Sequence, residues 1–187
     1  MSAKSSYQVP IEFPFFDYVF KNQDLIRYAI LHPSLSQRRK THKKKDIDFD
    51  RMEFVGDRIL GLVIADNLYK RYPQADEGEL SLRSANLVCM ETLYQICLKC
   101  ELNQYIQYDT LGYDSRMVKN LFADAMEAFL AALFLDGGLD VVKSFIHKYW
   151  SDLIDNESKP LKRPKTQLQE YLHLKKMSSP VYVLMEK

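Results

Sequence analysis

The sequence has few of the residues that mark several large protein classes. Its 187 residues include three cysteines, too few for a disulfide framework, and only six glycines and seven prolines, too few for a collagen-like or low-complexity chain. No apolar run approaches the roughly 20 residues of a membrane span, and residues 1–10 lack the apolar centre of a signal peptide. We therefore expect a reducing, cytoplasmic location and no membrane contact.

An excess of charge of one sign is also lacking, because 26 Lys and Arg stand against 25 Asp and Glu and leave a formal net charge of +1. This balance excludes a polycation that binds nucleic acid by bulk charge alone. The hydrophobic fraction of 47% and the charged fraction of 27% are ordinary for a globular protein, and the length suffices for one well-packed domain with a short second segment. Dinucleotide-binding, P-loop and nucleophile-elbow motifs are absent, so no organic cofactor is expected.

The hydrophobic periodicity predicts an all-α domain over residues 1–156. Apolar residues recur at helical spacing, and no long segment alternates with period two before residues 181–184, where we expect a strand. The predicted helices cover residues 15–31 with a break at Asn22, 50–71, 79–102, 120–135 with a glycine cap at 137–138, and 140–155 with Asp140 as its cap. A linker over 157–163 precedes a short amphipathic helix over 166–175.

Residues 34–48 form a polar stretch between two predicted helices. Six of the eight residues from Arg38 to Lys45 are basic. A like-charge run of this kind is typical of a solvated, flexible loop, and the alternative is a loop that contacts phosphates.

The few charges of two otherwise apolar helices are the strongest indication of chemistry. In residues 120–135 the only charged side chains are Asp124 and Glu127, which are three positions apart and share one helix face. Glu53 and Asp57 form a similar pair, four positions apart, and Asp50 lies one turn earlier on the same side. Unpaired carboxylates are rarely buried, because the loss of their water is costly.

Two interpretations of these acids stay open. The acids either lie on exposed faces or pair with Arg51, Arg58 or Arg83, or they converge on a common space. In the second case their mutual repulsion requires cations, and all-oxygen ligands favour hard ions such as Mg²⁺ or Mn²⁺. Two such ions about 3.5–4 Å apart are the usual arrangement for in-line attack on a phosphodiester. Gly56 and Gly61, which each cost a helix about 1 kcal/mol, indicate close approach of a backbone or ligand, although plain helix–helix contact explains Gly61 equally well.

Several blocks of the sequence together resemble those of one known family. Residues 50–60 (DRMEFVGDRIL) are similar to the signature helix of ribonuclease III, the double-stranded-RNA endonuclease. Residues 76–81 (DEGELS), 123–128 (ADAMEA) and 135–138 (LDGG) match the blocks that follow it, and residues 32–34 (HPS) match upstream. Residues 165–171 resemble the first helix of that family's double-stranded-RNA-binding domain. The likeness covers essentially the whole chain.

The resemblance implies a role for each matching position. The implied metal ligands are Glu53, Asp57, Asp124 and Glu127, of which Asp57 and Glu127 are also catalytic. Mg²⁺ is the implied cofactor, and Mn²⁺ is expected to substitute for it. Contacts with RNA are implied for Asp50, Glu77, Thr166, Gln169 and Glu170. Phe54 would enter a socket on a second copy of the chain, unless it is an ordinary core phenylalanine.

The implied fold is an all-α, dimeric helical bundle, followed over residues 164–187 by an incomplete α/β double-stranded-RNA-binding domain. The implied reaction is metal-dependent hydrolysis of double-stranded RNA to 5′-phosphate and 3′-hydroxyl ends, in the processing of rRNA and mRNA precursors. The alternatives are a dimer of the same fold that binds duplex RNA without cutting it, and an interaction scaffold with structural acids. Because non-cutting family members lack the metal carboxylates, the presence of all four favours the enzyme.

Three features depart from the family pattern. Asp50 stands where glutamate is typical and reaches one methylene less far. The basic loop over 37–45 is longer and more charged than usual, and neutralising Lys43, Lys44 and Lys45 should weaken RNA affinity and its salt dependence if the loop contacts phosphates. The later strands and the last helix of the RNA-binding domain have no counterpart, so we expect residues 164–187 not to fold independently.

Overall fold

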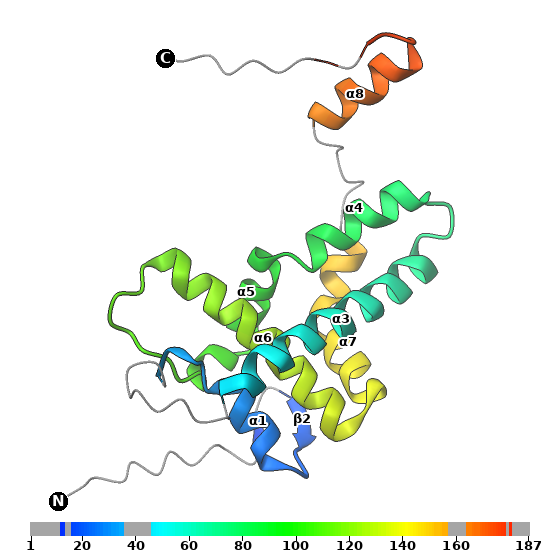
Figure 1. Cartoon of the computed structure of the whole chain (residues 1–187). Helices are drawn as coiled ribbons and strands as arrows, with labels where there is room; N and C mark the ends of the chain where they lie inside the picture. The colour runs from blue at the N-terminus through cyan, green and yellow to red at the C-terminus, as the bar shows by residue number, and fades with distance from the viewer. Residues whose placement is uncertain (1–11, 14–15, 36–45, 157–163, 179, 181–187) are drawn as a thin grey trace, which may run out of the picture.

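The computed structural model describes residues 12–13, 16–35, 46–156, 164–178 and 180, and within them the fold is all-α with one small hairpin (Figure 1). The elements in chain order are β1 (Glu12–Phe13), β2 (Phe16–Val19), α1 (Gln23–Ile30), α3 (Asp46–Arg71), α4 (Glu77–Leu87), α5 (Met90–Lys99), the 3₁₀ turn η1 (Leu102–Gln104), α6 (Ser115–Gly137), α7 (Leu139–Asn156) and α8 (Pro164–Leu174). None of the helices in these ranges is both long and apolar enough to cross a bilayer. The predicted all-α helical bundle is confirmed, whereas the incomplete RNA-binding domain over residues 164–187 stays a prediction.

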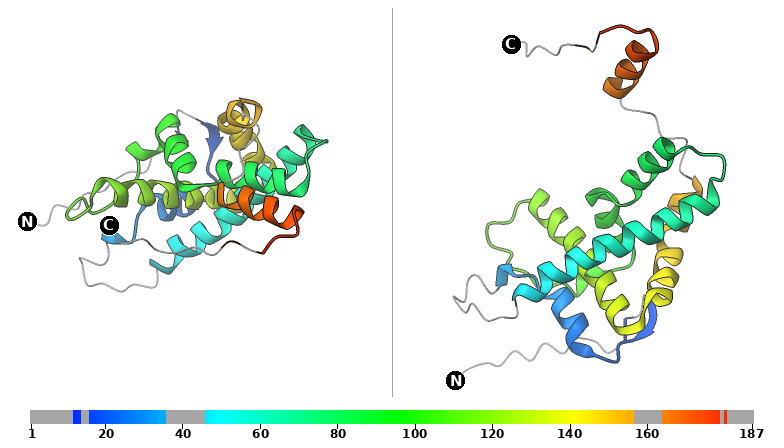
Figure 2. Two further views of the ribbon diagram at one scale, coloured as in Figure 1. Left: turned by 90° about the horizontal axis from the view of Figure 1, so that it is seen from above. Right: turned by 45° about the vertical axis from the view of Figure 1, so that its right-hand side comes forward.

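Helix α6 lies at the centre of the fold and packs against α1, α3, α5 and α7 (Figures 1 and 2). From Leu121 to Leu133 its residues are buried, except for the partly buried Asp124 and Glu127. A helix that is apolar on every side is stable only when other elements surround it. The two acids are therefore partly buried in largely apolar surroundings.

A short polar side chain and a glycine set the two ends of α6. Asp114 caps α6, because its carboxylate accepts a hydrogen bond from the backbone N–H of Met117 at 2.8 Å. The helix therefore begins five residues before the predicted start. Gly138 ends it with a φ of +81°, which confirms the predicted glycine cap.

The prediction of one helix over residues 79–102 was wrong, because the chain breaks at Val88 and Cys89 into α4 and α5. Side chains satisfy the carbonyl groups at the end of α4. The hydroxyl of Thr92 donates to the carbonyl of Asn86 at 2.7 Å, and the indole N–H of the buried Trp150 donates to the carbonyl of Leu87 at 3.0 Å.

The helix predicted over residues 15–31 was wrong in its first half, which forms β2 and pairs antiparallel with β1. Phe16 and Tyr18 are partly buried, and the residue after each of them is exposed, which is the alternation of a strand. Four residues are too few to separate this alternation from a helical period. The predicted break at Asn22 is confirmed, because its side chain caps α1 by accepting the N–H of Asp24 at 3.0 Å.

The remaining boundaries differ less. Asp140 does not cap α7 as predicted, because the helix already begins at Leu139 and Asp140 lies in its first turn. Helix α3 begins four residues before the predicted start, and α8 confirms the short helix predicted over 166–175. The basic run, the linker over 157–163 and the strand predicted over 181–184 lie outside the described residues. The division into domains stays a prediction.

Candidate metal centre

The crossing of α3 and α6 brings the acids of the two helices together. Gly56 lies at the point of closest approach, where an added Cβ atom would stand 1.8 Å from the backbone carbonyl oxygen of Glu127. A residue without a side chain is needed for two backbones to come this close. The close approach predicted at Gly56 is confirmed. Beyond its own helix backbone, Gly61 has no described atom within 4 Å of its Cβ position, so a helix–helix contact within the chain does not explain it, and the approach of a ligand there stays a prediction.

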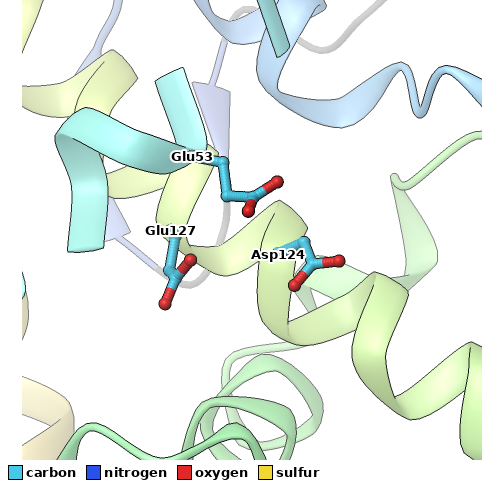
Figure 3. A group of neighbouring side chains, drawn as sticks. All are labelled: Glu53, Asp124 and Glu127. Carbon is cyan, nitrogen blue, oxygen red and sulfur yellow. The ribbon is translucent and has the colours of Figure 1, made fainter. Parts of the chain in front are cut away.

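Three carboxylates meet at this crossing. Glu53 from α3 and Asp124 and Glu127 from α6 each offer one oxygen atom, and these atoms lie within 4.8 Å of one another (Figure 3). All three side chains are partly buried, and with the described residues they form neither ion pairs nor hydrogen bonds. For these three acids the interpretation as arginine partners is excluded.

The surroundings of the three carboxylates favour their protonated forms. Burial, followed by the charges of Asp57, Asp124 and Glu53, raises the pKa of Glu127 to about 8. Burial and then the neighbouring acids raise the pKa of Glu53 to about 7. Burial and then the charge of Asp50 raise the pKa of Asp124 to about 6. A divalent cation would stabilise the charged forms that this environment disfavours.

Asp57 and Asp50 lie at the edge of this group. Asp57 is partly buried, and its Oδ2 lies 3.3 Å from Nη1 of Arg58. Its charge nevertheless contributes to the raised pKa values of Glu53 and Glu127. Asp50 is exposed on the preceding turn. The structure thus gathers three of the four predicted ligands and leaves Asp57 beside them, paired with an arginine.

The donor set fits a hard divalent cation. Its members offer carboxylate oxygens alone, which suit Mg²⁺ and Mn²⁺ better than zinc. Mg²⁺ usually keeps several waters and takes one or two protein carboxylates together with substrate oxygens. Because the three side chains are only partly buried, the group has access to solvent for such further ligands.

The other predicted site residues lie on different elements. Phe54 is 62% exposed on α3, which excludes the core-phenylalanine interpretation. Glu77 is the first residue of α4, and its carboxylate accepts a hydrogen bond from the hydroxyl of Ser81 at 3.1 Å. Three predicted RNA contacts lie on α8: Thr166, Gln169, which is exposed, and Glu170.

A set of contacts around His32, at the start of α3, was not predicted from the sequence. Nδ1 of His32 lies 2.9 Å from Oγ of Ser34, and the same oxygen accepts the backbone N–H of Asp109 at 3.0 Å. The imidazole ring contacts Phe49 of α3, with ring centroids 5.3 Å apart, and burial lowers the pKa of His32 against the opposing charge of Asp50. These contacts tie the segment after α1 and the loop before α6 to the start of α3. Residues 32–34 (HPS) were the sequence signal for these contacts, but residue types alone do not show which distant residues they contact.

Comparison with known sequences agrees with this geometry. The Ribonuclease-III-like family model matches residues 22–153. Ribonuclease 3 of Bartonella tribocorum is 35% identical over 170 residues, which cover 90% of this chain and 70% of that protein. Ribonuclease 3 of Mesorhizobium japonicum is 44% identical over 137 residues, which cover 72% of this chain and 62% of that protein.

Solved structures show the same architecture. The nuclease domain of ribonuclease III from Campylobacter jejuni aligns with a TM-score of 0.61 at 25% identity, over 75% of this chain and 92% of that one. A second structure of that domain, with flexibility in a region involved in dimer formation, gives a TM-score of 0.59 at 27% identity, over 72% and 92% of the two chains. The all-α bundle around α6 is the architecture of these nuclease domains.

Proposed function

Because the chain belongs to the ribonuclease-III-like family, we propose that it is an endoribonuclease that hydrolyses phosphodiester bonds of double-stranded RNA. The observation that supports this most directly is the meeting of Glu53, Asp124 and Glu127 at the crossing of α3 and α6. Unpaired and partly buried acids are costly to a fold, so their convergence indicates a ligand that compensates the cost.

We assign to these three carboxylates the binding of Mg²⁺, with Mn²⁺ as a substitute, and to Asp57 a supporting contact from the edge of the site. A divalent cation bound there would neutralise charge on the phosphate and supply a stronger nucleophile at neutral pH. With its pKa of about 8, the carboxyl group of Glu127 carries a proton near neutral pH before the cation enters. That proton must leave, because only the carboxylate form is a ligand.

The proposed enzyme is a homodimer. Exposed apolar side chains follow one face of α3 at helical spacing: Phe54, Leu62 and Tyr69. A row of this kind on a helix indicates an interface, and a two-fold axis would bury the same face of both copies. Each copy would then cut one strand, leaving 5′-phosphate and 3′-hydroxyl ends with a short 3′ overhang.

RNA would be held outside the acidic centre. We assign contacts to Asp50 before the centre, to Glu77 at the start of α4, and to the α8 residues Thr166, Gln169 and Glu170. A-form RNA is recognised mainly by shape, through its minor groove and backbone, which suits side chains presented on helices. The proposed substrates are structured precursors of rRNA and mRNA.

Cleavage of a long RNA duplex, with Mg²⁺ or with EDTA, tests the proposal. The wild type should cut only with the metal, and Glu127→Gln should bind RNA and dimerise without cutting. Asp140→Asn, which changes an exposed acid of α7, should cut like the wild type. If the wild type binds the duplex but cuts it at no concentration of Mg²⁺ or Mn²⁺, the chain is the non-cutting dimer instead. Cleavage that persists in EDTA would contradict the metal assignment.

A further inference from the structure

A positive charge lies at the edge of the acidic centre, on Arg58. Its Nη1 is 3.3 Å from Oδ2 of Asp57, and its guanidinium carbon lies 5.4 Å from the centroid of the Phe54 ring. An arginine that faces a carboxylate and also lies over an aromatic ring has two contacts to hold its planar group. These contacts hold the charge of Arg58 beside Asp57.

Asp57 links this charge to the three carboxylates. It lies four positions after Glu53 and on the same face of α3, so its charge acts on the same space that a cation would enter. A guanidinium paired with Asp57 offsets part of the negative potential there. It therefore lowers the repulsion among the acids and also lowers their attraction for a divalent cation.

We propose that Arg58 is a counter-charge that stabilises the metal-free form of the acidic centre and weakens the affinity of the centre for divalent cations. This inference rests on the metal centre proposed above. Because the Arg58 side chain is 71% exposed, solvent screens its charge, and the expected change in affinity is a few-fold.

Lys70 provides a matched control on the same helix. Its Nζ lies 2.7 Å from Oδ2 of Asp66, and the side chains of this pair are 68% and 39% exposed, against 71% and 41% for Arg58 and Asp57. The two pairs thus meet similar solvent. Lys70 is displaced from Arg58 by about 18 Å along the axis at 1.5 Å per residue, which exceeds the screening length of about 8 Å in physiological salt.

Titration of the full chain with Mn²⁺, followed by electron paramagnetic resonance, tests the proposal at one protein concentration and with the association state checked by light scattering. Arg58→Gln should bind Mn²⁺ about three-fold tighter than the wild type and unfold at a lower temperature in EDTA. If Arg58 only supported the fold, Arg58→Gln would lower both the affinity for Mn²⁺ and the unfolding temperature. Arg58→Lys, which keeps the charge, and Lys70→Gln should both retain wild-type affinity.

The outcomes distinguish failure of the counter-charge role of Arg58 from failure of the metal centre. If Arg58→Gln binds Mn²⁺ no tighter than the wild type, or if Lys70→Gln gains affinity equally, the counter-charge role is overturned. If the wild type itself binds no Mn²⁺, the metal centre is overturned, and with it the proposed function.

Discussion

Helix α6 carries acids at two places whose surroundings are opposite. At the crossing with α3, Asp124 and Glu127 find no donors among the described residues, and their pKa values are raised. At the end of the helix, Asp136 accepts hydrogen bonds from the Tyr18 hydroxyl at 2.7 Å and from the backbone N–H groups of Lys21 and Asn22 at 2.8 Å each. Burial acts to raise the pKa of Asp136, but these donors together lower it.

The difference separates an acid that has hydrogen-bond donors from acids to which the described residues offer none. Asp136 accepts three hydrogen bonds, from β2 and from the turn between β2 and α1, and so it joins the end of α6 to both. Asp124 and Glu127 add repulsion to the fold and receive no compensating contact from the described residues. Residue type and burial alone do not distinguish the two cases, whereas the direction of the pKa shift does.

Neutralising one acid at the crossing and one at the end of α6 should give the largest contrast. Glu127→Gln should lower the rate of duplex cleavage at least about a thousand-fold, because it removes charge that stabilises the transition state. The same change should stabilise the metal-free protein at pH 8, because it removes repulsion. Asp136→Asn should instead destabilise the fold by about 1–2 kcal/mol and leave the activity of the folded fraction unchanged.

Cleavage assays and urea unfolding of the two variants check this contrast. If Glu127→Gln fails to fold, or if Asp136→Asn folds but no longer cuts, the crossing and the end of α6 do not differ in the way described.

Two glycines of α3 test whether the crossing itself is required. Gly56→Ala should destabilise the protein by about 3 kcal/mol and abolish Mn²⁺ binding, because its Cβ would collide with the backbone of Glu127. Gly61→Ala should be tolerated and gain up to about 1 kcal/mol from helix propensity, because its Cβ position is open among the described atoms. Thermal unfolding and Mn²⁺ titration measure both effects. Equal behaviour of the two variants would contradict the close approach at Gly56.

The contributions of Glu127 and Asp136 to stability should depend on pH with opposite signs. In EDTA, between the ordinary pKa of Glu127 near 4.5 and its folded pKa of about 8, the folded state holds more protons than the unfolded state. Stability contributed through Glu127 therefore falls as the pH rises across this window. Asp136 has a lowered pKa, so its contribution is present above 3.8 and is lost as the pH falls through the folded value.

Urea unfolding at stepped pH values measures both contributions. Glu127→Gln should flatten the loss toward pH 8, and Asp136→Asn should flatten only the loss in acid. A loss toward pH 8 that persists in full in Glu127→Gln would contradict the assignment to that residue.

The smallest effect is expected for Tyr18→Phe, which removes one of the three donors to Asp136. The cost should be about 1 kcal/mol of unfolding free energy, with unchanged cleavage and an Asp136 pKa closer to its ordinary value. Burial and the bond to Asp136 raise the pKa of Tyr18 to about 12, so the hydroxyl remains a donor at all working pH values. Carbonyl-region NMR of Asp136 would show the shift, and its absence would mean that the two backbone donors suffice.

The sequence predicts the acids of the centre better than the elements around them. Two charges in an otherwise apolar helix have few explanations, so residue type and spacing suffice to single out Asp124 and Glu127. Glu53 and Asp57 share a helix face by spacing, but spacing does not show that Asp57 pairs with the adjacent Arg58. The choice between Gly56 and Gly61 depends on which face of α3 meets α6, and both have the same local signal.

The missed elements depend on partners that are distant in the sequence. The break between α4 and α5 is supported by Trp150, whose indole lies 63 positions from the Leu87 carbonyl that it contacts. β2 forms beside β1 and packs Phe16 against Phe145 of α7, with ring centroids 5.1 Å apart. The hydrophobic periodicity of a short segment carries no information about such distant contacts. Tertiary packing therefore decides whether the segment forms a strand or a helix.

The central claim is that a divalent cation lies between α3 and α6. X-ray diffraction at the manganese absorption edge, from crystals grown with Mn²⁺, tests it most directly. The account predicts an anomalous peak within coordination distance of Glu53, Asp124 and Glu127, and its loss in Glu127→Gln. Well-ordered carboxylates without such a peak at saturating Mn²⁺ would contradict it.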